Sequence, residues 1–455
     1  MRALYAPYPE YKESGVEWLA VIPSDWVVSK VKYLAPFQVG WTPPTKVDAN
    51  FIGENLWANI SDLKGKYIEH TAKNISDEAA KAASMEISPR GSLLYSFKLS
   101  VGAVSFASQD MYTNEAIASF IEGGSLPLSY LYYALPKFVI ENASTNIYGA
   151  RILNQELINN AFLLSPSYEE AEKIANFLDH ETAKIDTLID KQQQLIKLLK
   201  EKRQAVISHA VTKGLNPNTP MRDSGVEWFD KIPSHWIVSK FSYLSLVVRG
   251  GSPRPAGDPT LFGGDYSPWV TVAEITKNND LYLTNTESFL TQKGSEQCRV
   301  FSADTLILSN SGGTLGVPKI LKIDANANDG VLGFENLKIN REFAYFYLTT
   351  LTEKLREQIR NKGGSTQINL NTDIVKDIAI PVPPDNEIEE IVLHILSAIE
   401  KYKRLEEKAD DGIELLKERR TALISAAVTG KIDVRGWKSP EPSSTANKNN
   451  KEVAA

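Results

Sequence analysis

The amino-acid sequence runs for 455 residues and is 42% hydrophobic, 23% charged and 9% aromatic, a composition typical of soluble globular proteins. No apolar run approaches the roughly 20 residues that a membrane-spanning helix needs, and the N-terminus lacks the apolar region of a signal peptide. A single cysteine, Cys298, excludes disulfide bonds within the chain and suits a reducing compartment, so we expect a cytoplasmic protein. The net charge of −6 argues against a free-standing DNA-binding protein, which is more often basic.

The chain is an internal tandem repeat. The segment Ser14–Trp18, with the sequence SGVEW, returns as Ser224–Trp228. The similarity extends to the end of each half, where Leu198–Arg203 matches Leu415–Arg420. A chain of this length exceeds what one hydrophobic core usually holds, so each half is expected to fold around a core of its own.

The first part of each half is predicted to be a compact mixed α/β domain. Short apolar or β-branched runs alternate with glycine, proline and asparagine, which is the pattern of strands joined by turns. A tyrosine- and leucine-rich stretch follows in each half and is expected to form a helix that closes the domain. The expected strands are 92–97, 103–106, 305–308 and 317–320, and the expected closing helices are 128–142 and 343–360.

Each half then ends in a long helix. Ser167 is a candidate N-cap, and neither proline nor glycine interrupts the chain from there to about Lys213. Apolar residues recur at alternating steps of four and three, the heptad spacing of a coiled coil. The predicted seam consists of Ile174, Leu178, Ile185, Leu188, Leu195 and Leu199 in the first helix and Ile391, Ile395, Tyr402, Leu405 and Leu416 in the second.

So long an apolar seam needs a partner, and the equivalent helix of the other half is the nearest candidate. Two-fold-related halves with short connections require these two helices to run antiparallel. The alternative is an ordinary long helix that faces solvent, which the recurrence of the same seam in both halves disfavours.

These patterns divide the chain into five parts. They are a first α/β domain at 1–165, a first long helix at 166–215, a second α/β domain at 216–380, a second long helix at 381–433 and a polar tail at 434–455. The tail is rich in serine, asparagine, lysine and proline, so we expect it to be disordered.

No motif for catalysis is present in the sequence. It contains neither a Gly-x-x-x-x-Gly-Lys-Ser/Thr loop for nucleotide phosphates nor an Asn-Pro-Pro-Tyr-like motif for amino methylation. The five histidines lack the spacing of metal ligands, and Cys298 has no histidine near it in sequence. We therefore expect no catalytic residue, no metal site and no enzyme activity in this chain alone.

The order of domains and motifs resembles the specificity subunit of type I restriction–modification enzymes. SGVEW followed by Ile-Pro-x-x-Trp, at 14–26 and 224–236, is similar to the start of each target-recognition domain in that family. Gly363–Asn369 resembles the family's Gly-Ser-Thr-x-x-x-Asn loop, and Ile380–Pro384 resembles the Pro-Pro start of its conserved helix. The first half matches these last two motifs only in part, and the resemblance covers residues 8–435.

The resemblance implies a non-catalytic DNA-specificity subunit with two target-recognition domains. Each domain would read one half of a bipartite sequence in double-stranded DNA, while the helices would set the gap and dock two methylation subunits. Restriction subunits would join the full complex. S-adenosylmethionine, ATP and Mg would be bound by these partners and not by this chain. Because the partner subunits would also contact the DNA, the acidic net charge of this chain is compatible with DNA binding.

The candidate DNA contacts follow from residue type. Arg249 and Arg254 flank a Gly-Gly-Ser-Pro turn, from which arginine can reach phosphates or guanine edges. The other candidates lie on turns or loops and are Lys98, Arg151, Asn310, Ser365, Thr366 and Gln367, with Arg151 as the equivalent of Gln367. For each of them the alternative is a solvated surface side chain. The tryptophans Trp18, Trp26, Trp228 and Trp236 are interpreted as core anchors and not as base-stacking residues.

Two other functions compete with DNA recognition: a coiled-coil scaffold that binds proteins without any DNA role, and an enzyme whose site is split between the domains. The two halves keep their tryptophan, proline and glycine positions but diverge at 47–56 and 257–267. This distribution favours a shared frame that carries two different DNA-reading surfaces, and hence a DNA site that has two parts and is not a palindrome.

Overall fold

The computed structural model describes residues 5–98, 100–145, 149, 151–311, 314–361 and 369–439. Contacts divide the chain into two compact units, one formed by residues 1–191 and 412–455 and the other by residues 192–411. Each unit contains one globular domain and parts of both long helices, and we describe the units separately. Among the described residues, no helix is both long and apolar enough to cross a membrane.

The core of the first unit is a five-stranded sheet. Its strand order is β4 (Phe37–Val39), β11 (Ile117–Phe120), β8 (Leu93–Ser96), β9 (Val104–Ala107) and β6 (Tyr67–Ile68). Neighbouring strands are antiparallel, except that β6 runs parallel to β9. The central strand β8 is buried on both faces, since Tyr95 packs in one apolar cluster and Leu94 in another. The expected strands at 92–97 and 103–106 are confirmed.

Smaller elements surround this sheet in the first unit. The predicted helix at 128–142 is confirmed as α3 (Leu128–Phe138) followed by the 3-10 turn η3 (Val139–Asn142), and α3 packs on β8 and β9. A second sheet has the order β10 (Tyr112–Thr113), β5 (Asn55–Ala58) and β7 (Lys73–Ile75). The remaining short elements are α1 (Val31–Leu34), η1 (Asp48–Phe51), η2 (Ile60–Asp62), α2 (Asp77–Ala82), β12 (Ser144–Thr145), β13 (Arg151–Ile152) and α4 (Gln155–Asn160).

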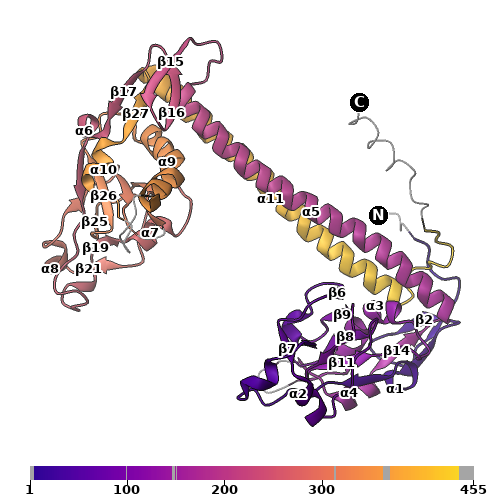
Figure 1. Ribbon diagram of the computed structural model, residues 1–455. Helices are drawn as coiled ribbons and strands as arrows, with labels where there is room; N and C mark the ends of the chain where they lie inside the picture. The colour runs from indigo at the N-terminus through magenta and orange to yellow at the C-terminus, as the bar shows by residue number, and fades with distance from the viewer. Residues whose placement is uncertain are drawn as a thin grey trace, which may run out of the picture. The chain divides into compact units, whose positions relative to one another are not determined.

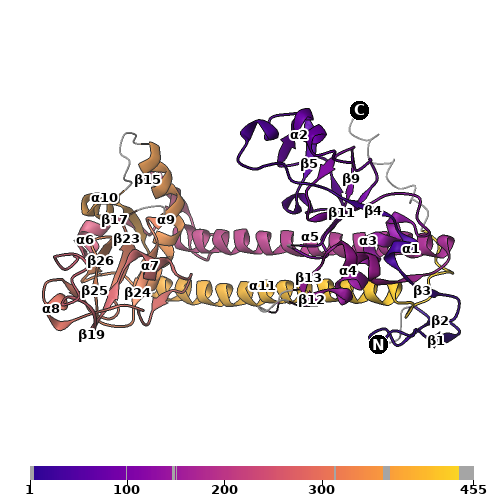
Figure 2. The ribbon, with the colours of Figure 1, turned by 90° about the horizontal axis from the view of Figure 1, so that it is seen from below.

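The second unit repeats the five-stranded sheet in the same order. Its strands are β18 (Leu246–Arg249), β26 (Val331–Glu335), β23 (Leu306–Ser309), β24 (Pro318–Leu321) and β20 (Tyr282–Leu283). The closing helix α9 (Arg341–Asn361) packs on β24, as Figure 2 shows. A second sheet has the order β21 (Phe289–Leu290), β19 (Phe262–Val270), β25 (Ala325–Ala327) and β22 (Val300–Phe301), and the short helices are α6 (Phe241–Leu244), α7 (Val272–Thr276), α8 (Gln292–Ser295) and α10 (Thr372–Asp377). The strands and the helix predicted for this half are confirmed.

In each unit, short strands join the domain to its long helix. A hairpin leads into each domain: β1 (Tyr11–Glu13) with β2 (Val21–Pro23) in the first unit, and β15 (Met221–Val226) with β16 (Phe229–Pro233) in the second. A strand pair closes each domain: β3 (Val27–Lys30) with β14 (Phe162–Ser165), and β17 (Ile237–Lys240) with β27 (Ala379–Val382). Trp26 and Trp236, each 1% exposed, donate their indole N–H groups to Glu170 at 3.2 Å and to Glu387 at 2.9 Å. These two tryptophans are therefore core anchors, as predicted. The same prediction is wrong for Trp18, which is 41% exposed with its ring against Phe138.

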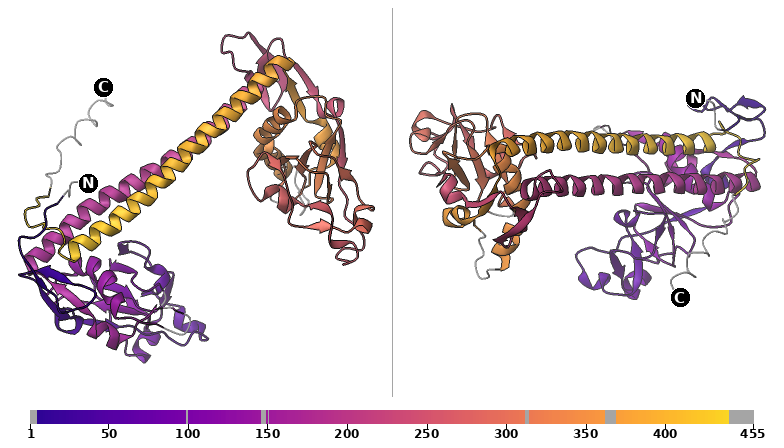
Figure 3. Two further views of the ribbon diagram at one scale, coloured as in Figure 1. Left: turned by 180° about the vertical axis from the view of Figure 1, so that it is seen from behind. Right: turned by 90° about the horizontal axis from the view of Figure 1, so that it is seen from above.

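The two long helices are α5 (Tyr168–Lys213) and α11 (Asp385–Val428). The hydroxyl oxygen of Ser167 accepts the amide N–H of Glu170, so the predicted N-cap is confirmed. In the first unit the early part of α5 lies beside the late part of α11, where Asp186 pairs with Arg420 at 3.0 Å (Figure 1; Figure 3). In the second unit Arg203 pairs with Glu406 at 3.2 Å. The helices therefore run antiparallel, as predicted.

The buried face of the helices differs from the predicted seam in one of its two rows. Ile174, Leu178, Ile185, Ile391 and Ile395 are buried, and Leu199, Tyr402 and Leu416 are half-buried. Leu188, Leu195 and Leu405 are instead 46%, 42% and 39% exposed. The neighbouring Ile189, Ile196 and Glu406 take the inward row. Arg203 and Glu406 also face inward, where they pair at 3.2 Å, so the buried rows combine apolar residues with a charged pair.

The chain after α11 folds back onto the first unit. Val434 is 2% exposed, and the ring of Trp437 lies 5.7 Å from the ring of Phe177 at the start of α5. The amide N–H of Asp433 donates to the carbonyl oxygen of Ala6 at 2.8 Å. The prediction of a disordered tail is therefore wrong for Val434 and Trp437, and positions 440–455 of that tail lie outside the described residues.

Candidate nucleic-acid interface

Three of the predicted DNA-binding residues meet at one end of the five-stranded sheet in the second unit. Arg249 is the last residue of β18, and Asn310 directly follows β23. The strand between them, β26, begins just after Asp329, and pairs with both neighbours. Strand pairing therefore brings side chains that are far apart in sequence to one place. We call Arg249, Ser252, Arg254, Asn310 and Asp329 the second-domain edge.

Asp329 is the common partner within the second-domain edge. Its main-chain oxygen accepts Nε of Arg249 at 2.6 Å and Nδ2 of Asn310 at 3.1 Å. Its carboxylate accepts the hydroxyl of Ser252 at 2.6 Å and lies 3.9 Å from Nη2 of Arg249. The hydrogen bond from Ser252 lowers the pKa of Asp329, and the charges of Arg249 and Arg254 lower this pKa further. The carboxylate is therefore ionised at neutral pH and holds one arginine beside it.

A close backbone approach shapes the loop that carries these residues. The amide N–H groups of Gly250 and Gly251 donate to the main-chain oxygens of Val331 and Ala327, each at 2.9 Å. A Cβ on Gly250 would overlap the carbonyl oxygen of Ala327, so only glycine fits there. The Gly-Gly-Ser-Pro turn seen in the sequence is thus the support that places Ser252 against Asp329.

The two arginines of the second-domain edge remain accessible. The side chain of Arg249 is 55% exposed although it pairs with Asp329. Arg254 is exposed, and its amide N–H donates to Oε1 of Gln297 at 3.0 Å. Because Nε of Arg249 is already bonded to protein, its terminal Nη groups are the donors that can reach a ligand.

Asn310 has a different character from the arginines. It is 2% exposed, and its buried Oδ1 has no hydrogen-bond partner among the described residues. The main-chain oxygen of Asn310 accepts the N–H of Leu370 at 2.7 Å, and Ser311 forms a β-bridge with Asn369. The end of the predicted loop 363–369 therefore joins this same edge, whereas Ser365, Thr366 and Gln367 lie outside the described residues.

The first unit carries an equivalent edge built from other side chains. Glu115, just before β11, accepts a hydrogen bond from the hydroxyl of Thr42 and lies 3.8 Å from Nζ of Lys98. Burial raises the pKa of Glu115, but the bonds from Thr42 and from its own backbone and the charge of Lys98 outweigh burial, so the net pKa is lowered. A Cβ on Gly40 would overlap the carbonyl group of Thr113, as at Gly250. We call Thr42, Lys98 and Glu115 the first-domain edge.

Arg151 lies apart from the other candidates. It is an exposed residue of β13, which pairs with β12, and its Nη1 donates to the main-chain oxygen of Ile140 at 3.3 Å. Its proposed equivalence to Gln367 stays a prediction, since Gln367 is not described. As DNA contacts, these positions stay predictions.

Residue type alone missed the two carboxylates and the two hydroxyls. Asp329 and Glu115 follow an asparagine whose side chain accepts the N–H two residues later, at 3.1 Å in both units. The repeat does contain the signal, because Asn114-Glu115 aligns with Asn328-Asp329. Residue type does not point to these positions, because acidic residues repel phosphate and so do not suggest a DNA contact.

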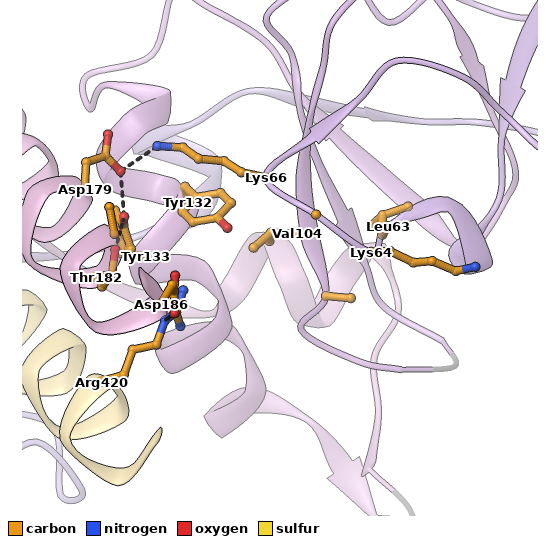
Figure 4. Close-up of a pocket in the computed structure, with 13 residues that line it drawn as sticks. Leu63, Lys64, Lys66, Val104, Tyr132, Tyr133, Asp179, Thr182, Asp186 and Arg420 are labelled. Carbon is orange, nitrogen blue, oxygen red and sulfur yellow. Dashed lines mark hydrogen bonds and ion pairs between the residues drawn. The ribbon is translucent and has the colours of Figure 1, made fainter. Parts of the chain in front are cut away.

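The first unit also contains a cavity of about 520 Å³ between its domain and its helices, shown in Figure 4. Several of the polar groups that line it bind one another. Nζ of Lys66 lies 2.5 Å from Oδ1 of Asp179, which also accepts the hydroxyl of Tyr133 at 2.6 Å. Arg420 pairs with Asp186 on the other helix. The groups around this cavity serve to hold the domain on the helices.

The comparisons with known proteins agree with this duplicated architecture. The family profile described as type I restriction modification DNA specificity domain matches residues 23–198 and 236–415. The specificity subunit of the type I restriction enzyme MjaIX from Methanocaldococcus jannaschii is 24% identical over 444 residues, which cover 93% of this chain and 97% of that protein.

Two solved structures share the fold. The HsdS subunit from Thermoanaerobacter tengcongensis has a TM-score of 0.54 at 14% identity, with 90% of this chain and 98% of that chain covered. A chain from a structural study of the assembly and conformational transition of the type I R-M system has a TM-score of 0.68 at 14% identity, with 90% and 99% covered.

Proposed function

The chain belongs to the family of type I restriction modification DNA specificity domains, and from that premise we propose that its two domains read the two halves of a bipartite DNA sequence. It acts as the specificity subunit of a type I complex. The long helices set the gap between the half-sites.

The duplicated edge is the observation that supports this proposal. Each unit presents a cation beside a carboxylate at the same end of its five-stranded sheet. The cations differ, since they are Arg249 and Arg254 in one unit and Lys98 in the other. Arginine can donate two hydrogen bonds to a guanine edge, whereas lysine is a point donor. A common frame with different donors is what two readers of different half-sites require.

Catalysis belongs to partner subunits in this proposal. Methylation subunits bring S-adenosylmethionine, and restriction subunits bring the ATP- and Mg-dependent chemistry. We found no motif for these groups in the sequence, and the described residues contain no cluster of three or more side chains that could hold a metal ion.

Exposed leucines support docking of two methylation subunits on the helices. In the second unit Leu195 and Leu198 of α5 and Leu393, Leu396 and Leu405 of α11 are each between 38% and 67% exposed. Exposed apolar side chains that lie close together, such as Leu195 with Leu198, are a feature of protein interfaces. On this proposal the leucines excluded from the helix–helix seam contact the partners.

A domain exchange tests the proposed function. Residues 14–160 are replaced by the equivalent domain of a relative with a different DNA site, and the methylated positions are then mapped in the genome of a host that carries the methylation subunits. We expect one half-site to change and the other to persist. If both half-sites changed, the domains would not be independent readers, and methylation without any sequence preference would support a scaffold role.

A further inference from the structure

Both edges contain a carboxylate, which is Asp329 in the second unit and Glu115 in the first. An isolated acidic residue beside phosphate weakens DNA binding. Here each carboxylate is bonded by a hydroxyl, lies beside a cation and follows an asparagine turn, and this arrangement occurs in both units. The hydroxyls of Ser252 and Thr42 occupy equivalent places in the repeat.

We propose that Asp329 and Glu115 are positioning residues for specificity, which fix the cations Arg249 and Lys98 in one orientation at their half-sites. The inference rests on the proposed function and goes beyond it by naming what makes these cations selective. Neither carboxylate touches a base in this role.

The contacts between Arg249 and Asp329 support this fixed orientation. Its Nε donates to the main-chain oxygen of Asp329 at 2.6 Å, and its Nη2 lies 3.9 Å from the carboxylate of the same residue. Two contacts to one residue restrict a long, rotamer-rich side chain that is 55% exposed. The Nη groups then point to one place, which suits bidentate bonding to a base.

The negative charge of Asp329 also favours binding of Arg249 to a base over binding to phosphate. A free arginine at this edge would bind any phosphate within reach, and each such contact adds to sequence-independent affinity. The paired carboxylate offsets one positive charge, so the site gains little from phosphate and more from a base edge of the right shape. The same reasoning applies to Lys98, which lies 3.8 Å from Glu115.

The test uses Asp329→Asn, which removes the charge but keeps the main-chain oxygen and an acceptor for Ser252. The complete complex with its methylation subunits is titrated against duplexes that carry the mapped site, the site with the first half scrambled, or the site with the second half scrambled. We expect the preference for the intact second half-site to fall on the order of tenfold. Affinity for the duplex with the second half scrambled should rise, and its dependence on salt should steepen by about 0.9 in the log–log slope.

Two matched variants separate positioning from a structural effect. Glu115→Gln should relax the first half-site and leave the second unchanged. Asp304→Asn removes a carboxylate at the opposite end of β23, where it pairs with Lys322 at 2.7 Å and Arg341 at 2.8 Å, and should leave both preferences unchanged.

The possible outcomes distinguish this inference from the function beneath it. A wild-type complex without any sequence preference would refute the proposed function itself. A selective wild type whose Asp329→Asn variant keeps full preference at the second half-site would overturn the positioning role alone. An equal loss at both half-sites would also overturn it, since that would indicate a general defect in folding or assembly.

Discussion

At the scale of single residues, folding stability does not account for the cations at the two edges. The side chains of Arg249 and Lys98 are 55% and 48% exposed in their pairs with carboxylates. Exposed ion pairs contribute only about 0–1 kcal/mol to folding, because water screens them and long side chains lose entropy. The recurrence of a cation beside a carboxylate in both units therefore points to binding.

Replacing Arg249 by lysine keeps the positive charge and removes the planar donor fork. We expect Arg249→Lys to retain most of the complex's affinity for DNA while losing about 1–3 kcal/mol of discrimination at one position of the second half-site. Titration of the complex with duplexes altered one base pair at a time measures this. Lys98→Arg is the companion variant and should affect the first half-site only. A uniform loss across all duplexes would mean that Arg249 contacts phosphate alone.

The cations of the site can be predicted from the sequence but their partners cannot, and the reason is physical. Arg249 and Asp329 are 80 positions apart, and only the pairing of β18 with β26 brings them together. The burial of Asn310 likewise depends on main-chain groups of Asp329 and Leu370. Residue type predicts what a side chain can bond to, but the long-range strand register decides which side chains meet.

At the scale of elements, the sequence predicted the strands, the closing helices and the antiparallel long helices, because each has a local pattern and occurs twice. The register between the two long helices is harder to predict from the sequence. Leu188 and Ile189 are both apolar, so heptad counting allows either row. Next to the exposed Leu405, the charged Glu406 takes the inward row and pairs with Arg203 at 3.2 Å, which apolar spacing does not predict.

Adjacent substitutions on α5 test this register. Ile189→Asp introduces a charge into the inward row and should lower the free energy of unfolding by more than about 1 kcal/mol. Leu188→Asp, one residue earlier, lies on the exposed face and should change this free energy by less than about 0.5 kcal/mol in the free chain. Urea unfolding of the two variants gives the comparison. The reverse order of the two effects would restore the seam that apolar spacing predicts.

The segment after α11 contributes to the stability of the first unit. Val434 is 2% exposed, Trp437 packs on Phe177, and Asp433 bonds to the main chain of Ala6. A chain that ends at residue 430 loses these contacts, and we expect it to lose about 2–4 kcal/mol of stability, given the usual value of buried apolar side chains.

The control for this truncation is a chain that ends at residue 439, which keeps Val434 and Trp437 and removes only positions 440–455. Thermal unfolding should place this control within error of the full chain and the shorter one clearly below it. Equal stability of all three chains would show that the returning segment adds nothing.

At the scale of the whole molecule, the duplication explains how an acidic chain can recognise DNA. The net charge of −6 describes the complete surface, whereas the two edges concentrate their cations at equivalent ends of the two sheets. The frame repeats in strand order, glycine loops and tryptophan anchors, while the cations at the two edges differ. The symmetry is therefore one of architecture, and the expected DNA site has two unlike halves.

The length of the long helices is the feature that should set the gap between these halves. Inserting four residues within Leu195–Lys202 of α5 lengthens it by ~6 Å, or about two base steps of ~3.4 Å. Because α5 and α11 run antiparallel, a matching insertion beside Ala409 of α11 keeps the two helices in step. Four residues also turn the helix by roughly 40° beyond a full turn, whereas seven leave the rotation within roughly 20°.

We therefore expect the paired four-residue insertion to widen the recognised gap by about two base pairs and a paired seven-residue insertion to widen it by about three, with both half-sites unchanged. Insertion into α5 alone should weaken methylation without defining a new gap, since the partner helix no longer matches it. Mapping of methylated positions distinguishes these results. Altered half-sites at a constant gap would show that the helices do not act as the spacer, and that the gap is set within the domains or by the methylation subunits.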